Sequence, residues 1–320
     1  MQLGAGMELQ VFSPSELGAV LRALRNVAVA NEHFTDAERA LVKGIAHLHD
    51  FDVDPDALQP ISGQVLARIV TDPHRRKRAL QAAIVMALVE GVPSDRTEVA
   101  VRELATALEI GEQGLAVLSE LAQGNALVAR FDMFRRVTRF LRNAKTFPGV
   151  LQLALPMLGV GAGDPKLAAR YRELSRCSAG TFGRALYDHF VENDFKFPGE
   201  PGGIAMVFHD VGHVLAGYAT DPQGEIQQAA FQAGFARRDG FSFLLFGILQ
   251  FHVGMRITPV AKGYTGLFDV PLVLDALRRG AACKVDFSED FDVFAYQHRE
   301  LAQLRSELGI PPLRSMAKAG

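Results

Sequence analysis

The chain has 320 residues, of which 48% are hydrophobic and 22% charged, so it can bury one large core or two ordinary ones. Its 34 basic and 36 acidic residues leave a net charge of −2, which excludes a nucleic-acid binder that works through bulk positive charge and disfavours a disordered chain. Two cysteines, Cys177 and Cys283, are too few for a disulfide framework or a thiolate zinc cluster, which fits a reducing compartment.

Helix-start signals dominate the first third of the chain. Ser13–Glu16 (SPSE) offers an N-cap serine, a proline in the first turn and a glutamate that can close a capping box. Thr35–Glu38 (TDAE) is a second capping box and opens a helix over Ala40–His49. Ala79–Glu90 has the composition of a buried helix, and Asp95–Leu108 begins with an acid-rich turn. Because no long stretch alternates apolar and polar residues, we expect an all-α protein with almost no sheet.

Two segments of this region share one layout. Val29–Ala46 and Val85–Ala105 each run from the end of an apolar helix through a short loop to a capped helix. The repeat predicts a small pseudo-symmetric helical bundle over residues 10–127. The layout resembles the TerB-like helical domains of tellurite resistance proteins. We carry no metal site over from that resemblance, because helix caps and solvated faces account for the acidic residues.

A basic amphipathic segment joins the two halves. Ala129–Phe147 has apolar residues near helical spacing and six basic residues against one acid, Asp132. Such a helix can lie on an anionic lipid surface. It can equally bridge two domains while the stems of its arginines cover apolar surface, and we regard this as the more common arrangement. The basic residues are Arg130, Arg135, Arg136, Arg139, Arg142 and Lys145.

Targeting and membrane-spanning signals are missing from the sequence. The first residues carry no signal peptide or presequence pattern, so we expect a cytoplasmic protein. The two most apolar stretches, Val150–Gly163 and Phe241–Met255, are shorter than the roughly 20 residues that a helix needs to cross a bilayer. Peripheral contact with the inner face of the membrane stays open.

The stretch with clear chemistry lies between residues 206 and 225. His209 and His213 are four residues apart, so on a helix both imidazoles project from one face, as two nitrogen ligands of zinc require. Asp210 lies about 100° around the same turn and can reach the edge of that face. A break at Gly217 followed by a new helix start predicts a helical hairpin that brings Glu225 back over the two histidines.

Two interpretations of these residues compete. A single histidine on an apolar helix is usually a core residue with a satisfied hydrogen bond, and we interpret His189 and His252 in that way. Here, however, four ligand-type side chains fall within 17 positions, on a helix where an unpaired aspartate would be costly. This favours a metal site, best suited to Zn²⁺, with Fe²⁺ or Mn²⁺ as alternatives.

The spacing H-D-x-x-H, eleven residues and then E resembles the signature of the ubiquinone (coenzyme Q) biosynthesis protein 4 family. Thr181–Tyr187 (TFGRALY) is similar to that family's segment upstream, and Leu304–Ile310 (LRSELGI) to its closing segment. The resemblance covers about residues 130–314. Val207 and Phe208 stand where the family commonly has an Arg-Glu run, and the family's Pro-Trp pair is missing, which indicates a divergent relative.

The resemblance implies an all-helical domain over residues 128–314, with Zn²⁺ held by His209, Asp210, His213 and Glu225 beside an apolar tunnel for a polyprenyl tail. It further implies work on the head group of a polyprenylated benzoquinone precursor, of the oxidative decarboxylation type, or the organisation of quinone biosynthesis. Asp210 and Glu225 would then be the catalytic residues, since a carboxylate ligand that loosens can move a proton. Other quinone-biosynthesis proteins and a second copy of the chain, as a homodimer, are the partners that this allows.

Two rival functions remain. An HD-type metal phosphohydrolase shares the His209–Asp210 doublet, but it needs a further upstream histidine, for which His189 is the near candidate. A non-catalytic scaffold that binds prenyl lipids would use the metal only for structure. The 22 phenylalanines, many of which flank or follow the histidine motif, are expected to form a core without tryptophan or, with the resemblance, part of a tunnel wall.

Overall fold

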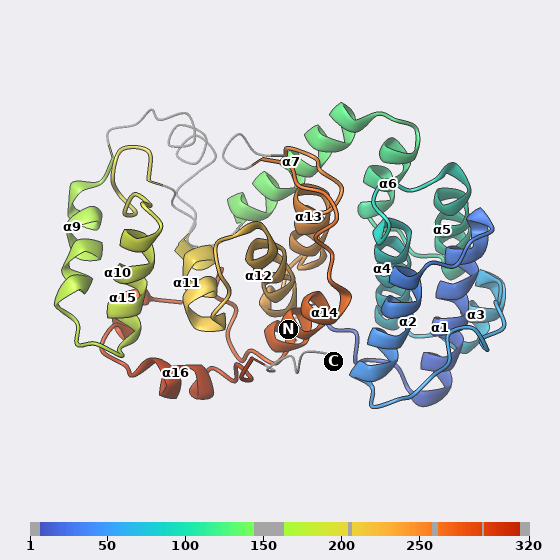
Figure 1. Ribbon diagram of the computed structural model, residues 1–320, viewed down its shortest axis with the longest axis horizontal. Helices are drawn as coiled ribbons and strands as arrows, with labels where there is room; N and C mark the ends of the chain where they lie inside the picture. The colour runs from blue at the N-terminus through green and yellow to red at the C-terminus, as the bar shows by residue number, and fades with distance from the viewer. Residues whose placement is uncertain (1–6, 144–162, 204–206, 258–261, 290, 314–320) are drawn as a thin grey trace. The chain divides into compact units, whose positions relative to one another are not determined.

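The computed structural model describes residues 7–143, 163–203, 207–257, 262–289 and 291–313 (Figure 1). Every regular element in these ranges is a helix, which confirms the all-α class. The only strand-like pairings in them are two isolated bridges, Thr181 with Glu300 and Val253 with Thr265. None of the helices in this part of the chain has the length and apolar composition that a membrane crossing requires.

The packing divides the chain into two units. The N-terminal unit comprises Met7–Arg135 and Phe241–Leu274, and the C-terminal unit comprises Arg136–Gly240 and Asp275–Gly320 with Met1–Gly6. The helices of the N-terminal unit are α1 (Pro14–Ala28), α2 (Asp36–Leu48), α3 (Gly63–Ile69), α4 (Pro73–Leu88), α5 (Asp95–Leu108), α6 (Gly114–Ala122) and α13 (Phe241–Phe251). Those of the C-terminal unit are α9 (Pro165–Glu173), α10 (Phe182–Glu192), α11 (Val207–Ala216), α12 (Pro222–Phe235), α15 (Val293–Tyr296) and α16 (Leu301–Glu307). Helices α7 (Ala126–Asn143) and α14 (Val270–Ala281) contain residues of both, and the 3₁₀ turns η1 (Val29–Asn31) and η2 (Leu174–Arg176) complete the order.

The predicted helix starts are confirmed in the N-terminal unit. Helix α1 has the complete capping box, in which the Ser13 amide donates to the Glu16 carboxylate at 2.8 Å. Helix α2 has the same box, with the Thr35 amide donating to Glu38 at 2.7 Å. Helix α4 begins six residues before the predicted start at Ala79, because Asp72 caps it and Pro73 occupies its first turn.

Helix α13 packs with the N-terminal unit although it follows the histidine motif in sequence. Almost all of its side chains are buried, and Phe241 and Leu245 lie where Gly114 leaves room for them. His252, at its end, bonds the Val89 carbonyl at 2.8 Å, and burial lowers the pKa of this imidazole. His252 is thus a hydrogen-bonded core residue, as predicted. The division into domains of residues 10–127 and 128–314 stays a prediction.

Phenylalanine rings pack against one another in the core of the C-terminal unit. Phe231, Phe235 and Phe287 are at most 1% exposed and pack edge-to-face, with ring centroids 5.4 Å apart for Phe231 and Phe235 and 4.8 Å for Phe235 and Phe287. Helices α12 and α14 meet at Gly234 and Gly280, where a β-carbon would lie within 2.4 Å of the opposite backbone. This close crossing fixes α12, which carries one of the predicted metal residues.

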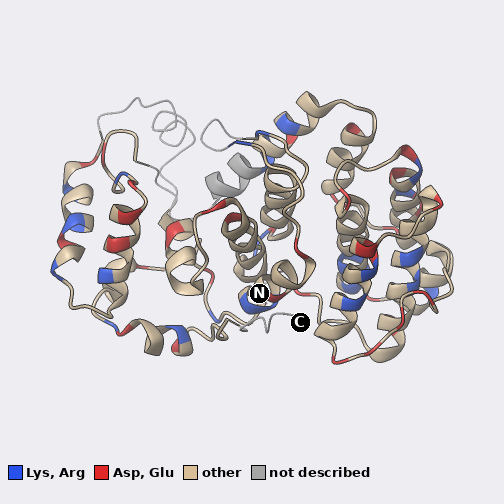
Figure 2. Ribbon diagram, in the orientation of Figure 1, with Lys and Arg blue, Asp and Glu red and all other residues tan. Residues whose placement is uncertain are grey.

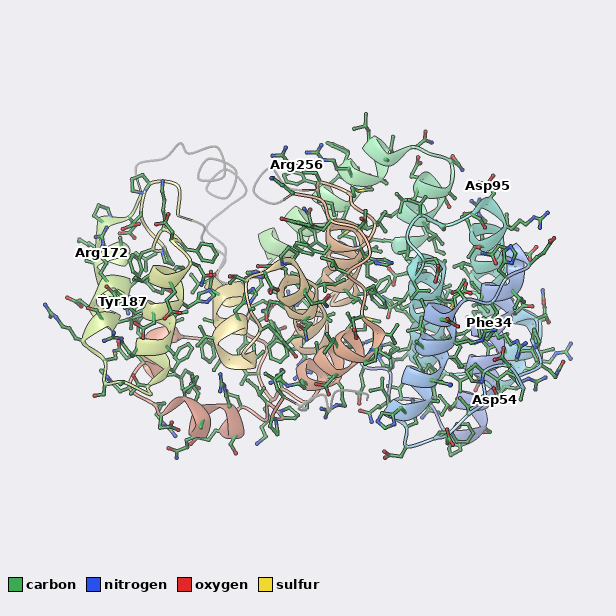
Figure 3. The ribbon with its side chains drawn as sticks, viewed as in Figure 1. Phe34, Asp54, Asp95, Arg172, Tyr187 and Arg256 are labelled. Carbon is green, nitrogen blue, oxygen red and sulfur yellow. The ribbon has the colours of Figure 1, made fainter. Side chains whose placement is uncertain are left out.

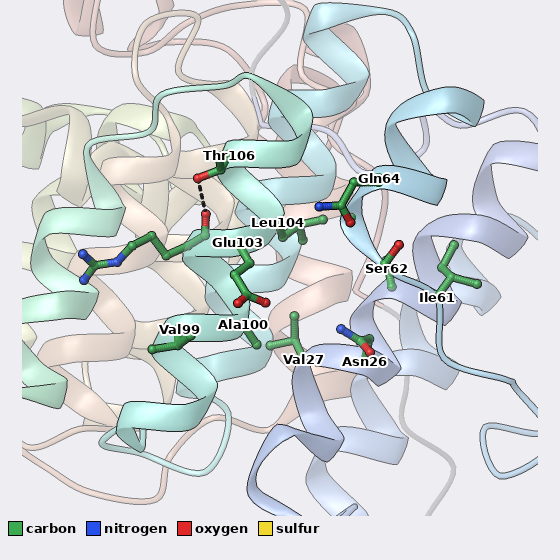
Figure 4. A pocket seen from close by; sticks show the side chains of 13 residues that line it. Asn26, Val27, Ile61, Ser62, Gln64, Val99, Ala100, Glu103, Leu104 and Thr106 are labelled. Carbon is green, nitrogen blue, oxygen red and sulfur yellow. Dashed lines mark hydrogen bonds between the residues drawn. The ribbon is translucent and has the colours of Figure 1, made fainter.

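The N-terminal unit contains a hollow of about 370 Å³ between α1, the start of α3 and α5 (Figure 4). Its lining mixes apolar side chains such as Val27 and Leu104 with polar ones such as Asn26, Gln64 and Glu103. None of the predicted metal residues lines it. Nearby in sequence, the Phe34 ring (labelled in Figure 3) faces the guanidinium groups of Arg25 at 5.1 Å and Arg39 at 4.8 Å.

Candidate metal centre

Helix α11 presents His209 and His213 on one face and ends immediately after them. Gly217 adopts a φ of +79°, which stops the helix at minimal steric cost. Two arginines satisfy the carbonyls left open at this end: Arg305 donates to Leu215 at 2.9 Å, and Arg279 to Ala216 at 2.9 Å. The predicted helix stop is confirmed, and the last turn that carries His213 is held firmly.

Helix α12 returns the chain to these histidines. Asp221 caps it by accepting from the Gly224 amide at 2.7 Å, and Pro222 occupies its first turn. A β-carbon at Gly224 would lie 2.0 Å from the Ala219 carbonyl oxygen, so only glycine allows so tight a connection. Glu225 therefore stands at the start of α12, facing α11, as the hairpin prediction requires.

Three ligand atoms converge on one point. The Nε2 atoms of His209 and His213 are 3.1 Å apart. The Glu225 carboxylate places one oxygen 3.2 Å from the first and the other 3.4 Å from the second. Zinc–nitrogen bonds of about 2.0–2.1 Å give ligand–ligand edges of about 3.3 Å in a tetrahedron. The distance between the two Nε2 atoms is close to such an edge, and each carboxylate oxygen faces one imidazole. The structure thus brings together three of the four predicted metal residues, with one ligand atom from each within 4.8 Å of the others.

The tautomer of His213 is set by the hydrogen bond of its Nδ1 atom. Its Nδ1 lies 3.1 Å from the Tyr218 carbonyl oxygen, which can only accept, so Nδ1 carries the hydrogen and the Nε2 of the neutral ring is a bare lone pair. Arg279 holds the Tyr218 ring in turn, donating to its hydroxyl at 2.6 Å. The lone pair of a 2% exposed histidine thus faces a carboxylate and a second imidazole, an arrangement that either a proton on His209 or a metal ion between them would satisfy.

Two buried glutamines of α12 contact His209. Gln232 lies 3.1 Å from His209 Nδ1, and Gln228 donates to the His209 carbonyl at 3.2 Å. With Glu225 they form a polar stripe at helical spacing (i, i+3, i+7) on a helix whose other side chains are mostly apolar. With a metal on His209 Nε2, the outer nitrogen carries the hydrogen, and the Gln232 amide would have to turn its oxygen toward it to accept. Sequence reasoning missed both glutamines, although their spacing from Glu225 was a usable signal.

The charges of this cluster are strongly coupled. Burial alone would disfavour an imidazolium, but the Glu225 carboxylate outweighs it and raises the pKa of His209 to about 9. Burial likewise opposes a charged carboxylate, yet the two histidines hold the pKa of Glu225 far below its usual range. In the absence of a metal, a proton held between His209 and Glu225 would neutralise the site.

Asp210, the fourth predicted ligand, lies outside this group of three. Its carboxylate pairs with His189 Nε2 at 3.1 Å, and the His189 ring stacks on that of His213 with centroids 5.7 Å apart. His189 therefore belongs to the surroundings of the site, a place that the sequence suggested only under the phosphohydrolase alternative and not for a core histidine. The usable signal was Asp210 itself, since a largely buried carboxylate on an apolar helix calls for a partner. A direct bond from Asp210 to a metal stays a prediction.

Comparison with known proteins adds no relative: no protein-family model matches the chain, and no curated protein matches it. The functional interpretation therefore depends on the residues of the site and on the spacing of the motif.

Proposed function

We propose that the protein binds one divalent metal ion, Zn²⁺ in first place, through His209, His213 and Glu225. The observation that supports this most is that two imidazole nitrogens and a carboxylate place one ligand atom each within 4.8 Å of one another, with the His213 tautomer fixed by a backbone carbonyl. Fe²⁺ and Mn²⁺ suit the same donors, two imidazoles and a carboxylate. Three protein ligands leave a coordination position for a substrate, which distinguishes catalytic zinc sites from closed structural ones.

We further propose that the substrate is a polyprenylated benzoquinone precursor, modified at its head group. Support comes from the motif: the histidines and the glutamate whose spacing resembles the ubiquinone biosynthesis protein 4 family are the same three that converge. A bound metal supplies Lewis acidity toward a ring carboxylate or phenolate. The protein's own contribution is to fix the two imidazoles through Tyr218 and Gln232, and to place the Asp210–His189 pair beside them, where it can accept or return a proton.

An HD-type phosphohydrolase is the alternative that one contact favours. That family needs an upstream histidine near the His-Asp doublet, and His189 bonds Asp210. Against it, the carboxylate that faces both His209 and His213 comes from Glu225, a residue that the phosphohydrolase pattern does not require. Release of inorganic phosphate from nucleotides by the metal-loaded protein would favour the alternative. A non-catalytic prenyl-lipid scaffold would keep lipid binding and pathway product after loss of the metal.

The test is elemental analysis and lipid extraction from one preparation of the full chain. We expect about one divalent metal per chain, as a single ligand set implies, and an isoprenoid in the extract. His213→Ala should lose the metal, whereas His33→Ala, which removes an exposed histidine of the N-terminal unit, should keep it. Full metal content in His213→Ala would contradict the site assignment, and a protein that carries metal but binds no isoprenoid would contradict the substrate assignment alone.

A further inference from the structure

The largest run of exposed apolar side chains in the described ranges lies on α7. Leu127 is 78% exposed, Phe131 63% and Phe134 37%. Their spacing of four and three residues places all three on one face of the helix, and we call them the outer stripe. Phe51 and Val92 are isolated exposed apolar side chains, and the pair Val65 and Ile69 on α3 is shorter and on average less exposed, at 39% and 40%. Single exposed residues need no explanation, but a continuous stripe does.

The opposite face of α7 is well anchored. Ala129 and Met133 are fully buried, and they lie on the far side of the helix from the outer stripe. Arg136, on the same far side, makes two hydrogen bonds to the Asp239 carboxylate, at 3.0 and 2.7 Å. The helix is therefore held in place through its back, which leaves the outer stripe turned away from the protein.

Positive charge borders the outer stripe on both sides. On a helical projection Arg130 lies about 70° to one side of the middle of the stripe, and Arg135 about 70° to the other. Asp132, the one acidic residue of Ala126–Asn143, is already paired with Arg135 at 3.2 Å. The chain as a whole is nearly neutral, with 34 basic and 36 acidic residues, so this excess is local. Figure 2 shows basic positions along α7 in blue.

We propose that the outer stripe is a docking surface for an anionic lipid membrane. Leucine and phenylalanine would enter the boundary between head groups and acyl chains, as in helices that lie flat in a membrane interface. Arg130, and Arg135 on exchanging its Asp132 partner, would extend their guanidinium groups to lipid phosphates while their stems cover the apolar edge. The sequence left open a lipid surface and a domain bridge; α7 contains residues of both units, and its exposed stripe remains available to a lipid surface. This inference does not depend on the metal site.

The test is sedimentation of the full chain with two kinds of vesicle, phosphatidylcholine alone and phosphatidylcholine in which about one lipid in four is phosphatidylserine. We expect binding to the anionic vesicles, weaker binding to the neutral ones, and a decrease with added salt. Phe131→Ser should weaken binding at least about tenfold, because an aromatic side chain that would be buried in the membrane interface is lost. Arg130→Gln should weaken it about fivefold, as the loss of one charge near the surface predicts.

Matched controls separate this surface from general stickiness. Phe51→Ser removes an exposed phenylalanine elsewhere, and Arg68→Gln an exposed arginine, and both should bind vesicles as the unchanged protein does. All four variants should keep the helical circular dichroism of the parent, since the changed side chains lie at the surface. Equal loss in Phe131→Ser and Phe51→Ser would overturn the proposal. Failure of the unchanged protein to bind anionic vesicles would also overturn it. If Phe131→Ser then breaks a dimer, the outer stripe is a protein interface and not a lipid one.

Discussion

Glutamates at helix starts behave differently in the two units. In the N-terminal unit, Glu38 is 3% exposed and accepts from the backbone amide of Thr35, in a capping box of its own helix. In the C-terminal unit, Glu225 also stands in a first helical turn, but the contacts of its carboxylate are to His209 and His213. Burial raises the pKa of Glu38, whereas the histidines lower that of Glu225 although burial opposes this.

Residue type and helix position therefore do not identify a metal ligand. A carboxylate is identified as a metal ligand by the atom that it faces. Glu38 faces an N–H donor, so its charge is satisfied by the helix that it caps. Glu225 faces the nitrogens of two imidazoles, and the hydrogen of His213 is committed to Tyr218, so its charge is met by a proton on His209 or by a metal ion that displaces this proton.

The same glutamate-to-glutamine substitution should affect zinc binding at Glu225 and leave it unchanged at Glu38. Glu225→Gln removes the charge that holds the metal and should weaken zinc binding by more than about a hundredfold, since even residues that only support ligands cost ten- to a hundredfold. Glu38→Gln should leave zinc binding unchanged and alter the free energy of unfolding by less than about 1 kcal/mol, because glutamine also closes a capping box. Zinc competition with a chelator and urea unfolding measure the two quantities. Equal zinc affinity in the two variants would break the comparison.

Glycines on the helices of the two units should also respond differently. A β-carbon at Gly212 of α11 would lie 1.9 Å from Gln228 Nε2, the amide that bonds His209. Gly212→Ala should therefore cost about 1–3 kcal/mol of the free energy of unfolding and weaken zinc binding as well. Gly18 of α1 has no atom near that position, so Gly18→Ala should stabilise the protein by about 0.5–1 kcal/mol. A stabilised Gly212→Ala protein would show that α11 and α12 pack less closely than described.

The pH dependence of zinc binding follows from the proton that the metal must displace. The pKa of His209 is raised from 6.5 to about 9. The metal-free protein gains stability from this below about pH 6.5 and loses it as the pH rises through about 9. Glu225 has a lowered pKa, so its contribution to the stability of the metal-free protein is present above about pH 4.5 and is lost only in strong acid.

Zinc affinity should accordingly rise about tenfold per pH unit up to about pH 9 and then level off. About one proton should be released per zinc bound, which calorimetry in buffers of different ionisation enthalpy measures. Affinity that does not change between pH 6.5 and 9 would show that His209 does not hold a proton in the metal-free protein.

Local features of the fold were predictable from the sequence, and long-range ones were not. The starts of α1, α2 and α5 follow from capping residues within a few positions of each helix, and the structure confirms them. The convergence of His209, His213 and Glu225 was predictable for the same reason, because one short hairpin of α11 and α12 brings them together.

The pairing of Asp210 with His189 depends instead on how α10 packs against α11, twenty-one residues away in sequence. Likewise, nothing within Phe241–Phe251 indicates which unit α13 joins, since a helix that is apolar on all sides can be buried against any core. The outer stripe of α7 was predictable in part. Its amphipathic pattern was visible, but only packing shows which face is covered.

The metal site can be observed directly by X-ray absorption at the zinc edge of the purified, zinc-loaded protein. We expect one bound zinc with nitrogen and oxygen ligands at about 2.0–2.1 Å, and the scattering pattern of two imidazoles, reduced to one in His213→Ala if any zinc remains. A zinc ion with sulfur ligands, or an imidazole signal that is unchanged in His213→Ala, would contradict the proposed zinc site.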